Sequence, residues 1–245
     1  MAAASNDSMT SRGQRQDAQP LLPTPARRPA ATVVGCAVLI LASGTACVHE
    51  KYADPLDSRV DLWATAHLGE HGAALRLIAD VAQRYEVIVI ISIMFLACLA
   101  MRRLNGAVLA AIGTPAAALL TEWLLKPLAT HVYLGASYPS GHTTTAFALS
   151  TTTAVLLASP PGSPGKRARP ALRIAIVATT ALIGCAIGLS VVALGDHRFI
   201  DTVGGAAVGV AVVLTGTFLL DLPACRRILS LHRWQEKLTI RTPAG

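Results

Sequence analysis

Residues 171–193 read ALRIAIVATTALIGCAIGLSVVA and contain a single charged side chain, Arg173. An α-helix needs about 20 mainly apolar residues to cross the hydrocarbon core of a bilayer, so this stretch is long enough to span a membrane. It lacks the alternation of polar and apolar residues that a membrane-barrel strand requires. The stretch therefore predicts a transmembrane helix.

Five further apolar stretches share this character, at residues 31–48, 86–101, 105–125, 143–158 and 202–220. Of the 245 residues, 53% are hydrophobic and only 14% are charged. A soluble domain carries about a quarter charged residues, so the composition excludes that class, and the abundant apolar surface excludes a disordered chain. The five cysteines are odd in number and scattered, which does not indicate a disulfide framework. We predict an all-α fold, a transmembrane bundle of six helices.

Lys and Arg residues are unevenly distributed among the segments that connect these stretches. Most of the 21 lie in residues 1–30, 102–104, 159–170 and 221–245, which successive crossings place on one side of the membrane. Loops rich in Lys and Arg face the cytoplasm. We therefore predict a multi-pass protein of the plasma membrane with both termini cytoplasmic, and the net charge of +7 then needs no nucleic-acid partner.

The same pattern predicts the organisation of the chain. Residues 1–30 are rich in Ala, Ser, Pro, Gln and Arg without apolar periodicity, which is typical of a disordered cytoplasmic tail. Residues 31–220 form the predicted six-span membrane domain, and residues 221–245 form a basic cytoplasmic tail. The long outer loop, 49–85, has a second half that favours an amphipathic helix lying on the membrane surface.

Polar side chains collect where three predicted spans meet the outer side. Residues 122–126 read EWLLK at the end of the third span, and residues 138–142 read YPSGH before the fourth. Residues 195–201 read GDHRFID between the fifth and the sixth. The predicted orientation places all three segments on the extracytoplasmic face, which predicts a functional site there.

Two of these segments suit the binding of an anion. Ser140-Gly141-His142 opens a predicted helix, whose free amide groups and dipole favour negative charge. Gly141 leaves room for the backbone to approach a ligand. Lys126 adds a positive charge, and Glu122, one helical turn earlier, is spaced to hold it in place.

The third segment suits nucleophilic catalysis. His197 and Asp201 are four residues apart, so on one helical face the carboxylate can hydrogen-bond the imidazole and leave its other nitrogen free to attack. His142 is then placed to protonate the leaving group. These residues predict phosphoryl transfer through a phosphohistidine, without a metal or another cofactor.

At these residues the chain resembles the type-2 phosphatidic acid phosphatase superfamily of membrane lipid phosphatases. Pro139-Ser140-Gly141-His142 matches the second motif of that family in full. Ser190-Val191, then five residues, His197, three residues and Asp201 match the spacing of the third motif. The likeness spans roughly residues 121–210, and the six-helix core of the family fits the six predicted spans.

The resemblance implies a role for each matched residue. His197 would be the nucleophile, Asp201 the carboxylate that orients it and His142 the acid that protonates the leaving group. The residues expected to contact the phosphate are Lys126, Ser140 and Gly141.

Two departures from the family pattern concern the arginines that clamp the phosphate. The first motif of the family has Arg-Pro where this chain has Tyr133-Leu134, and the Arg of the third motif is replaced by Val191. Neither side chain can act as a planar bidentate donor. We expect His131 and Arg198, which lie close by in the sequence, to take this role.

These observations leave three functional hypotheses. The first is a metal-independent phosphatase that hydrolyses a lipid phosphomonoester or diphosphate, with membrane lipids and the lipid phosphate as its partners. The second, motivated by the missing arginines, is a catalytically weak or inactive relative that binds lipid phosphate. A small transporter ranks last, because only Glu122 and Arg173 resemble charges within the spans. The sequence does not indicate an oligomeric state.

Overall fold

The computed structural model describes residues 20–48, 55–129, 138–158 and 170–225. Every regular element within these ranges is helical. In chain order they are α2 (Thr24–Val48), α3 (Pro55–Leu68), the short 3₁₀ helix η1 (Gly69–His71), α4 (Gly72–Asp80), α5 (Arg84–Ala100), α6 (Leu104–Leu119), the π-helix η2 (Leu120–Leu125), α7 (Lys126–Leu128), α8 (Gly141–Ala158), α9 (Pro170–Ala193) and α10 (Phe199–Leu220). The all-α prediction is confirmed for the described residues. The third predicted span, 105–125, covers α6 together with η2, and each of the other five corresponds to one helix within a few residues at either end, apart from the start of α2.

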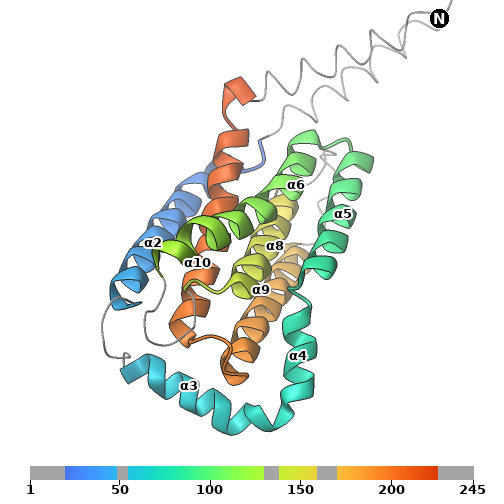
Figure 1. Cartoon of the computed structure of the whole chain (residues 1–245). Coiled ribbons are helices and arrows are strands. Elements are labelled where there is room, and N and C mark those ends of the chain that lie inside the picture. Colours follow the sequence, from blue (N-terminus) through green and yellow to red (C-terminus); the bar gives the residue numbers. More distant parts are fainter. Residues whose placement is uncertain (1–19, 49–54, 130–137, 159–169, 226–245) are drawn as a thin grey trace, which may run out of the picture.

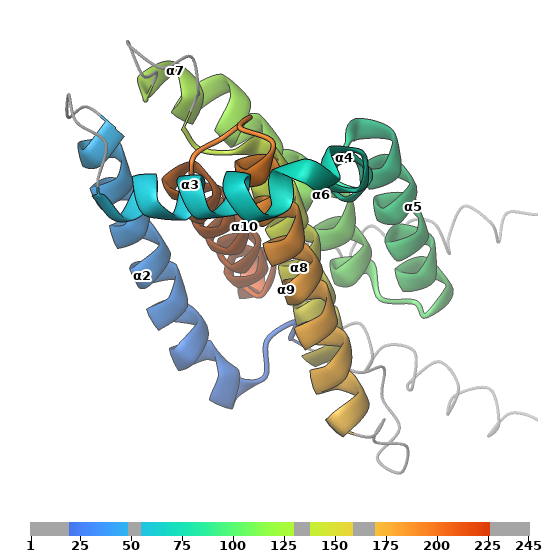
Figure 2. The same ribbon diagram turned by 90° about the horizontal axis from the view of Figure 1, so that it is seen from below.

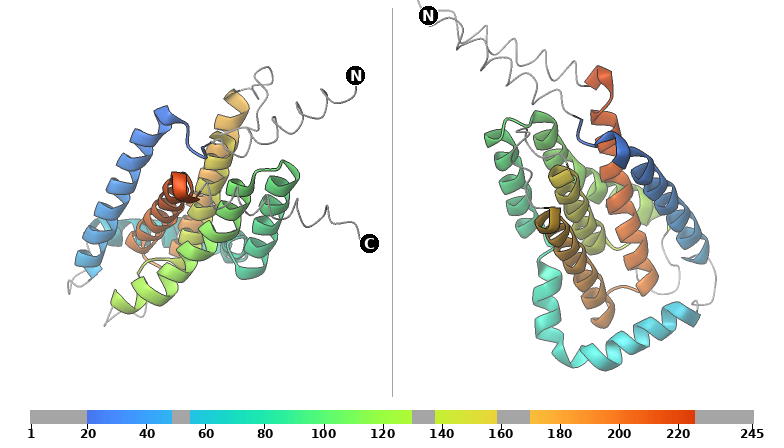
Figure 3. Two further views of the ribbon diagram at one scale, coloured as in Figure 1. Left: turned by 90° about the horizontal axis from the view of Figure 1, so that it is seen from above. Right: turned by 180° about the vertical axis from the view of Figure 1, so that it is seen from behind.

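Helix α10 is the centre of the bundle. It packs against α8, α2, α6 and α9, and α8 also packs against α6 and α9 (Figure 1). Helices α2 and α5 lie on opposite flanks of this centre (Figure 3). Half of the apolar stretch of α10 is buried, compared with 11% for α2. The outer helices turn large apolar side chains outward, including Leu39 on α2, Ile93 on α5 and Leu182 on α9, as expected of helices that face lipid.

Within the part of the chain that the structure describes, five segments are long and apolar enough to cross a membrane, which makes this a membrane protein. They are Thr24–Ala46, Pro55–Ala100, Leu104–Leu128, Pro170–Ala193 and Phe199–Leu220. Helix α8, predicted as the fourth span, is not among them. It carries buried Thr and Ser side chains, which lower its hydropathy. The count of six spans and the cytoplasmic placement of the termini therefore stay predictions.

Helices α3 and α4 lie across one end of the bundle and cover it (Figure 2). Ala64 of α3 and Leu75 of α4 are buried against Val192 and Ala193 at the end of α9. The predicted helix in the second half of the outer loop is confirmed as α4. Helix α3, in the first half, was not expected from the sequence.

The start of the membrane domain differs from the prediction. Helix α2 begins at Thr24 rather than at residue 31, so residues 20–30 do not belong to a disordered tail. The backbone N–H groups of Leu21 and Leu22 donate to the carboxylate of Asp221 at the end of α10, at 2.7 and 3.0 Å, and Arg27 lies 3.4 Å from the same carboxylate. These contacts hold the entry to α2 against the end of α10.

Candidate active site

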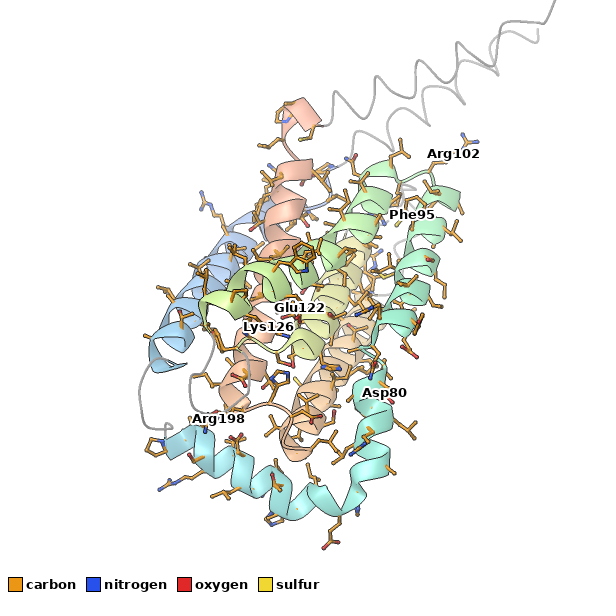
Figure 4. All side chains as sticks on the ribbon, in the orientation of Figure 1. Asp80, Phe95, Arg102, Glu122, Lys126 and Arg198 are labelled. Atoms are coloured by element: carbon orange, nitrogen blue, oxygen red, sulfur yellow. The ribbon has the colours of Figure 1, made fainter. Side chains whose placement is uncertain are left out.

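The three polar segments meet at the end of the bundle that α3 and α4 cover. Lys126 and Arg198 lie toward this end together with Asp80, whereas Arg102, between α5 and α6, lies at the opposite end (Figure 4). The predicted sharing of one end by residues 122–126, 138–142 and 195–201 is therefore confirmed, because all three emerge there (Figure 1).

A tight turn after α9 presents His197. Gly195 has φ +76°, a backbone conformation that side-chain-bearing residues rarely adopt. Its N–H donates to the carbonyl of Val192 at 2.9 Å, and the N–H of Asp196 donates to Val191 at 3.0 Å. This pair of bonds is the Schellman motif that closes a helix end. The chain reverses there, and the N–H of His197 also reaches the carbonyl of Val191, at 3.2 Å.

His197 and Asp201 form a buried pair. The imidazole Nδ1 lies 3.5 Å from Oδ2 of Asp201, and the exposed fractions of the two side chains are 12% and 0%. The same oxygen accepts the backbone N–H of Arg198 at 3.0 Å. His197 precedes α10 rather than lying on it, so the pair joins a loop to the first turn of the helix, which differs from the predicted shared helical face. At this distance the two atoms make no hydrogen bond, and among the described residues Nδ1 has no other hydrogen-bond partner. Because Nδ1 faces the carboxylate, Nε2 is the nitrogen available for attack, and catalytic contacts that are long in the free enzyme commonly shorten when substrate binds.

The beginning of α8 is bonded directly to the beginning of α10. The N–H of Ser140 donates to the backbone carbonyl of Asp201 at 2.9 Å, and Ser140 is fully buried. Thr144 donates its hydroxyl to the carbonyl of Ser140, also at 2.9 Å. The second and third motifs thus share a backbone hydrogen bond. His142 follows two positions after Ser140, and the side chains that act on it electrostatically include His197 and Lys126.

Glu122 and Lys126 complete the arrangement from the side of η2. Lys126 Nζ donates to Glu122 Oε1 at 2.5 Å, which confirms the predicted pairing (Figure 4). A β-carbon placed on Gly141 would lie 2.5 Å from Glu122 Oε1 and 3.7 Å from Lys126 Nζ. The lysine therefore stands beside the first residue of α8. Thr121 is hydrogen-bonded to Thr144 at 3.2 Å between hydroxyl oxygens, which joins η2 to α8.

Glycines on α10 permit this close approach. A β-carbon on Gly205 would lie 2.4 Å from the carbonyl oxygen of Ser140, and one on Gly209 would lie 2.4 Å from that of Thr144. Real contacts of this kind are longer than 3.0 Å. The two helices can therefore lie this close only because both positions lack a side chain.

The structure describes only one of the two residues expected to replace the family arginines. His131 and the Tyr133-Leu134 pair lie outside the described residues. The guanidinium of Arg198 lies 3.7 Å from the carboxylate of Asp57 on α3, and 22% of its side chain is exposed. Val191 is buried, and its backbone carbonyl supports the turn that carries His197. Phosphate contacts by His131 and Arg198 remain predictions.

The residues that link the motifs carry no distinctive signal in the sequence. Thr121 and Thr144 stood in apolar runs, where threonine carries no particular signal, and Asp57 lay in a loop remote from the motifs. Among the described residues, no group of three or more His, Cys, Asp or Glu side chains is arranged to hold a metal ion. The arrangement combines a carboxylate-paired imidazole, a helix N-terminus, a lysine and a second imidazole, which together suit nucleophilic attack on a bound phosphate.

The PAP2 superfamily model matches residues 87–221, which is more than half of the chain and includes all three polar segments. The chain belongs to the PAP2 superfamily. Membership indicates a membrane phosphatase-type activity and agrees with the resemblance found in the motifs. Comparisons with curated proteins and with solved structures gave no match.

Proposed function

We propose that this PAP2 protein is a metal-independent phosphatase of the plasma membrane that hydrolyses a lipid phosphomonoester or diphosphate on the extracytoplasmic side. The observation that supports this most is the His197–Asp201 pair, held by a backbone hydrogen bond against the start of α8. In this proposal His197 is the nucleophile and Asp201 its orienting carboxylate, and the first amides of α8 beside them bind the phosphate.

In the proposed first step, Nε2 of His197 attacks the phosphorus atom. A P–N bond forms while the bond from phosphorus to the leaving oxygen breaks. Protonated His142 gives its proton to that oxygen, so the lipid leaves as an alcohol, or as a monophosphate from a diphosphate. Asp201 stabilises the positive charge that develops on the imidazole of His197.

In the second step, water hydrolyses the phosphohistidine. His142, now neutral, takes a proton from the attacking water, and the P–N bond breaks to release inorganic phosphate. Lys126 and the first amides of α8 offset negative charge on the phosphoryl oxygens in both steps. Ser140 and Gly141 provide that helix start.

The surroundings of Lys126 support a lipid as the substrate. Trp123 is 80% exposed, and Leu124 and Leu128 are also exposed. Apolar side chains next to a phosphate-binding lysine suit a substrate whose tail stays in the bilayer while its phosphate enters the site, and tryptophan is enriched at membrane interfaces.

A second candidate function is lipid-phosphate binding with weak or no turnover. Val191, in the place of a family arginine, supports it, as does the contact of the Arg198 guanidinium with Asp57. Both leave the phosphate fewer positive partners than the family pattern supplies.

Phosphate release from a panel of lipid phosphates and diphosphates tests the two candidates. The detergent-purified protein is measured with and without EDTA, beside His197→Ala and, as a matched control, His71→Ala, which removes an exposed histidine. The phosphatase reading predicts release that survives EDTA, persists in the control and disappears in His197→Ala. Release no greater than that of His197→Ala across the panel, together with binding of the same lipids, would favour the second candidate.

A further inference from the structure

Two carboxylates of α3 contact the first turn of α10. Asp57 and Asp61 are one helical turn apart and share a face of α3. Helix α3 runs across the end of the bundle beside the start of α10 (Figure 2). Asp61 Oδ1 accepts the backbone N–H of Phe199 at 2.9 Å, and Asp57 Oδ1 accepts that of Ile200 at 2.7 Å. The partners are 138 and 143 positions apart in the sequence.

These bonds satisfy amides that a helix cannot satisfy itself. The first N–H groups of any α-helix have no acceptor within it, and a capping side chain usually comes from the residue just before the helix. Here that residue is Arg198, whose side chain cannot accept a hydrogen bond. Carboxylates from another helix supply the acceptors, and their negative charge is favoured by the positive end of the α10 dipole.

Asp57 also contacts the side chain of Arg198, as described above. It is only 4% exposed, and a buried carboxylate is stable only with such charged or hydrogen-bonding partners. Helix α3 therefore fixes the main chain at Phe199 and Ile200 and the side chain of Arg198.

The residues fixed in this way lie between His197 and Asp201. Their positions set the distance from the imidazole Nδ1 to the carboxylate, which is 3.5 Å. Helix α3 is itself packed against α9 through Ala64, which is fully buried. Helix α3 thus holds residues 198–200 through both main-chain and side-chain contacts. A preorganised site requires such support from its neighbours.

We propose that Asp57 and Asp61 are positioning residues for the His197–Asp201 pair. The inference rests on the proposed function, because it assigns these carboxylates a role in the same reaction. Neither contacts the reacting atoms. Their loss lets the first turn of α10 open and moves the nucleophile relative to its carboxylate, and a displacement of about 1 Å can cost about 100-fold in rate.

The test compares Asp57→Ala, Asp57→Asn, Asp61→Ala and Asp61→Asn with Glu70→Ala, which removes an exposed carboxylate between α3 and α4. We expect each alanine variant to lower kcat about 10- to 100-fold while KM changes less than about threefold. Asparagine still accepts an N–H through its oxygen. Asp61→Asn should therefore restore nearly all of kcat, whereas Asp57→Asn should restore only part, because it no longer carries the charge that faces Arg198.

Amide hydrogen exchange of the peptide covering residues 196–203 gives a second readout that needs no turnover. The alanine variants should exchange faster than the wild type in this peptide, and Glu70→Ala should not. If the wild type releases no phosphate, the proposed function fails while exchange still reports on the anchoring. Unchanged exchange in the alanine variants would overturn the inference, as would unchanged kcat in an active protein or a loss of kcat that asparagine at position 61 does not restore.

Discussion

Gly205→Ala tests whether the close contact between α10 and α8 sets the geometry of the site. The added β-carbon would lie 2.4 Å from the carbonyl oxygen of Ser140, 3.1 Å from Cβ of Thr143 and 3.1 Å from the backbone nitrogen of Thr144. Two of these three atoms belong to the backbone, so a side-chain rotation cannot relieve the whole contact. The first turn of α8 has to move.

The size of the movement follows from the contact. Bringing the nearest distance into the range of 3.0–3.4 Å requires a displacement of about 0.6 to 1 Å. Overpacking of this kind costs about 1–3 kcal/mol, and the better helix propensity of alanine offsets about 1 kcal/mol of it. The net loss of stability is therefore small, about 0–2 kcal/mol. The same displacement at a catalytic group lowers the rate by up to about 100-fold, so activity should fall much more than stability.

The assay measures kcat for phosphate release and thermal unfolding in detergent, with Gly216→Ala as the matched control. Gly216 lies on the same helix, and a β-carbon there would meet only Leu109 Cδ1, at 3.8 Å, an ordinary contact. We expect Gly205→Ala to lose about 10- to 100-fold in kcat and the control to keep its activity. A kcat for Gly205→Ala within twofold of the control would show instead that the start of α8 tolerates the displacement and that this contact does not set the geometry of the site.

Three further predictions follow from the site and the fold. His142→Ala should slow leaving-group release within the first turnover about 10²–10⁴-fold for an alkyl phosphate but much less for p-nitrophenyl phosphate, whose leaving group needs no proton. The first turnover leaves out phosphohistidine hydrolysis, in which His142 is the proposed base for both substrates, so equal losses on both would remove His142 from the role of acid. Lys126→Met removes the cation beside Gly141, so inorganic phosphate should inhibit the variant competitively with an inhibition constant about tenfold higher or more in steady-state assays. An unchanged inhibition constant would place the phosphate elsewhere. Asp221→Ala should lower the free energy of unfolding by about 1–3 kcal/mol, because it leaves the two buried N–H groups of Leu21 and Leu22 without their acceptor. Since these groups lie at the end of the bundle remote from the site, kcat should not change, and a loss of activity at unchanged stability would contradict this.

Much of the bundle was predictable because its helices are continuous apolar runs. The predicted spans at 171–193 and 202–220 correspond to α9 (Pro170–Ala193) and α10 (Phe199–Leu220). Within a bilayer the backbone must satisfy its own hydrogen bonds, so an apolar run of this length has few alternatives to a helix. The meeting of the three polar segments followed from counting crossings, because alternate connections emerge at the same end.

The remaining features depend on contacts between distant residues, which periodicity does not report. The early start of α2 is stabilised by Leu21 and Leu22 bound to Asp221, and the start of α10 by Asp57 and Asp61. Each is a backbone N–H bound to a carboxylate more than 100 positions away. In the sequence these acidic residues are indistinguishable from ordinary surface charges, so only the three-dimensional arrangement identifies their partners.

Trapping of the phosphoenzyme shows directly whether His197 is the nucleophile. The protein is mixed with a lipid phosphate whose phosphate group is radiolabelled, quenched within the first turnover and digested, and the labelled peptide is identified beside that of His197→Ala. We expect an acid-labile, base-stable label on His197 that is absent from the variant. Phosphate release by the wild type without any label on His197, or a label that persists in His197→Ala, would contradict it.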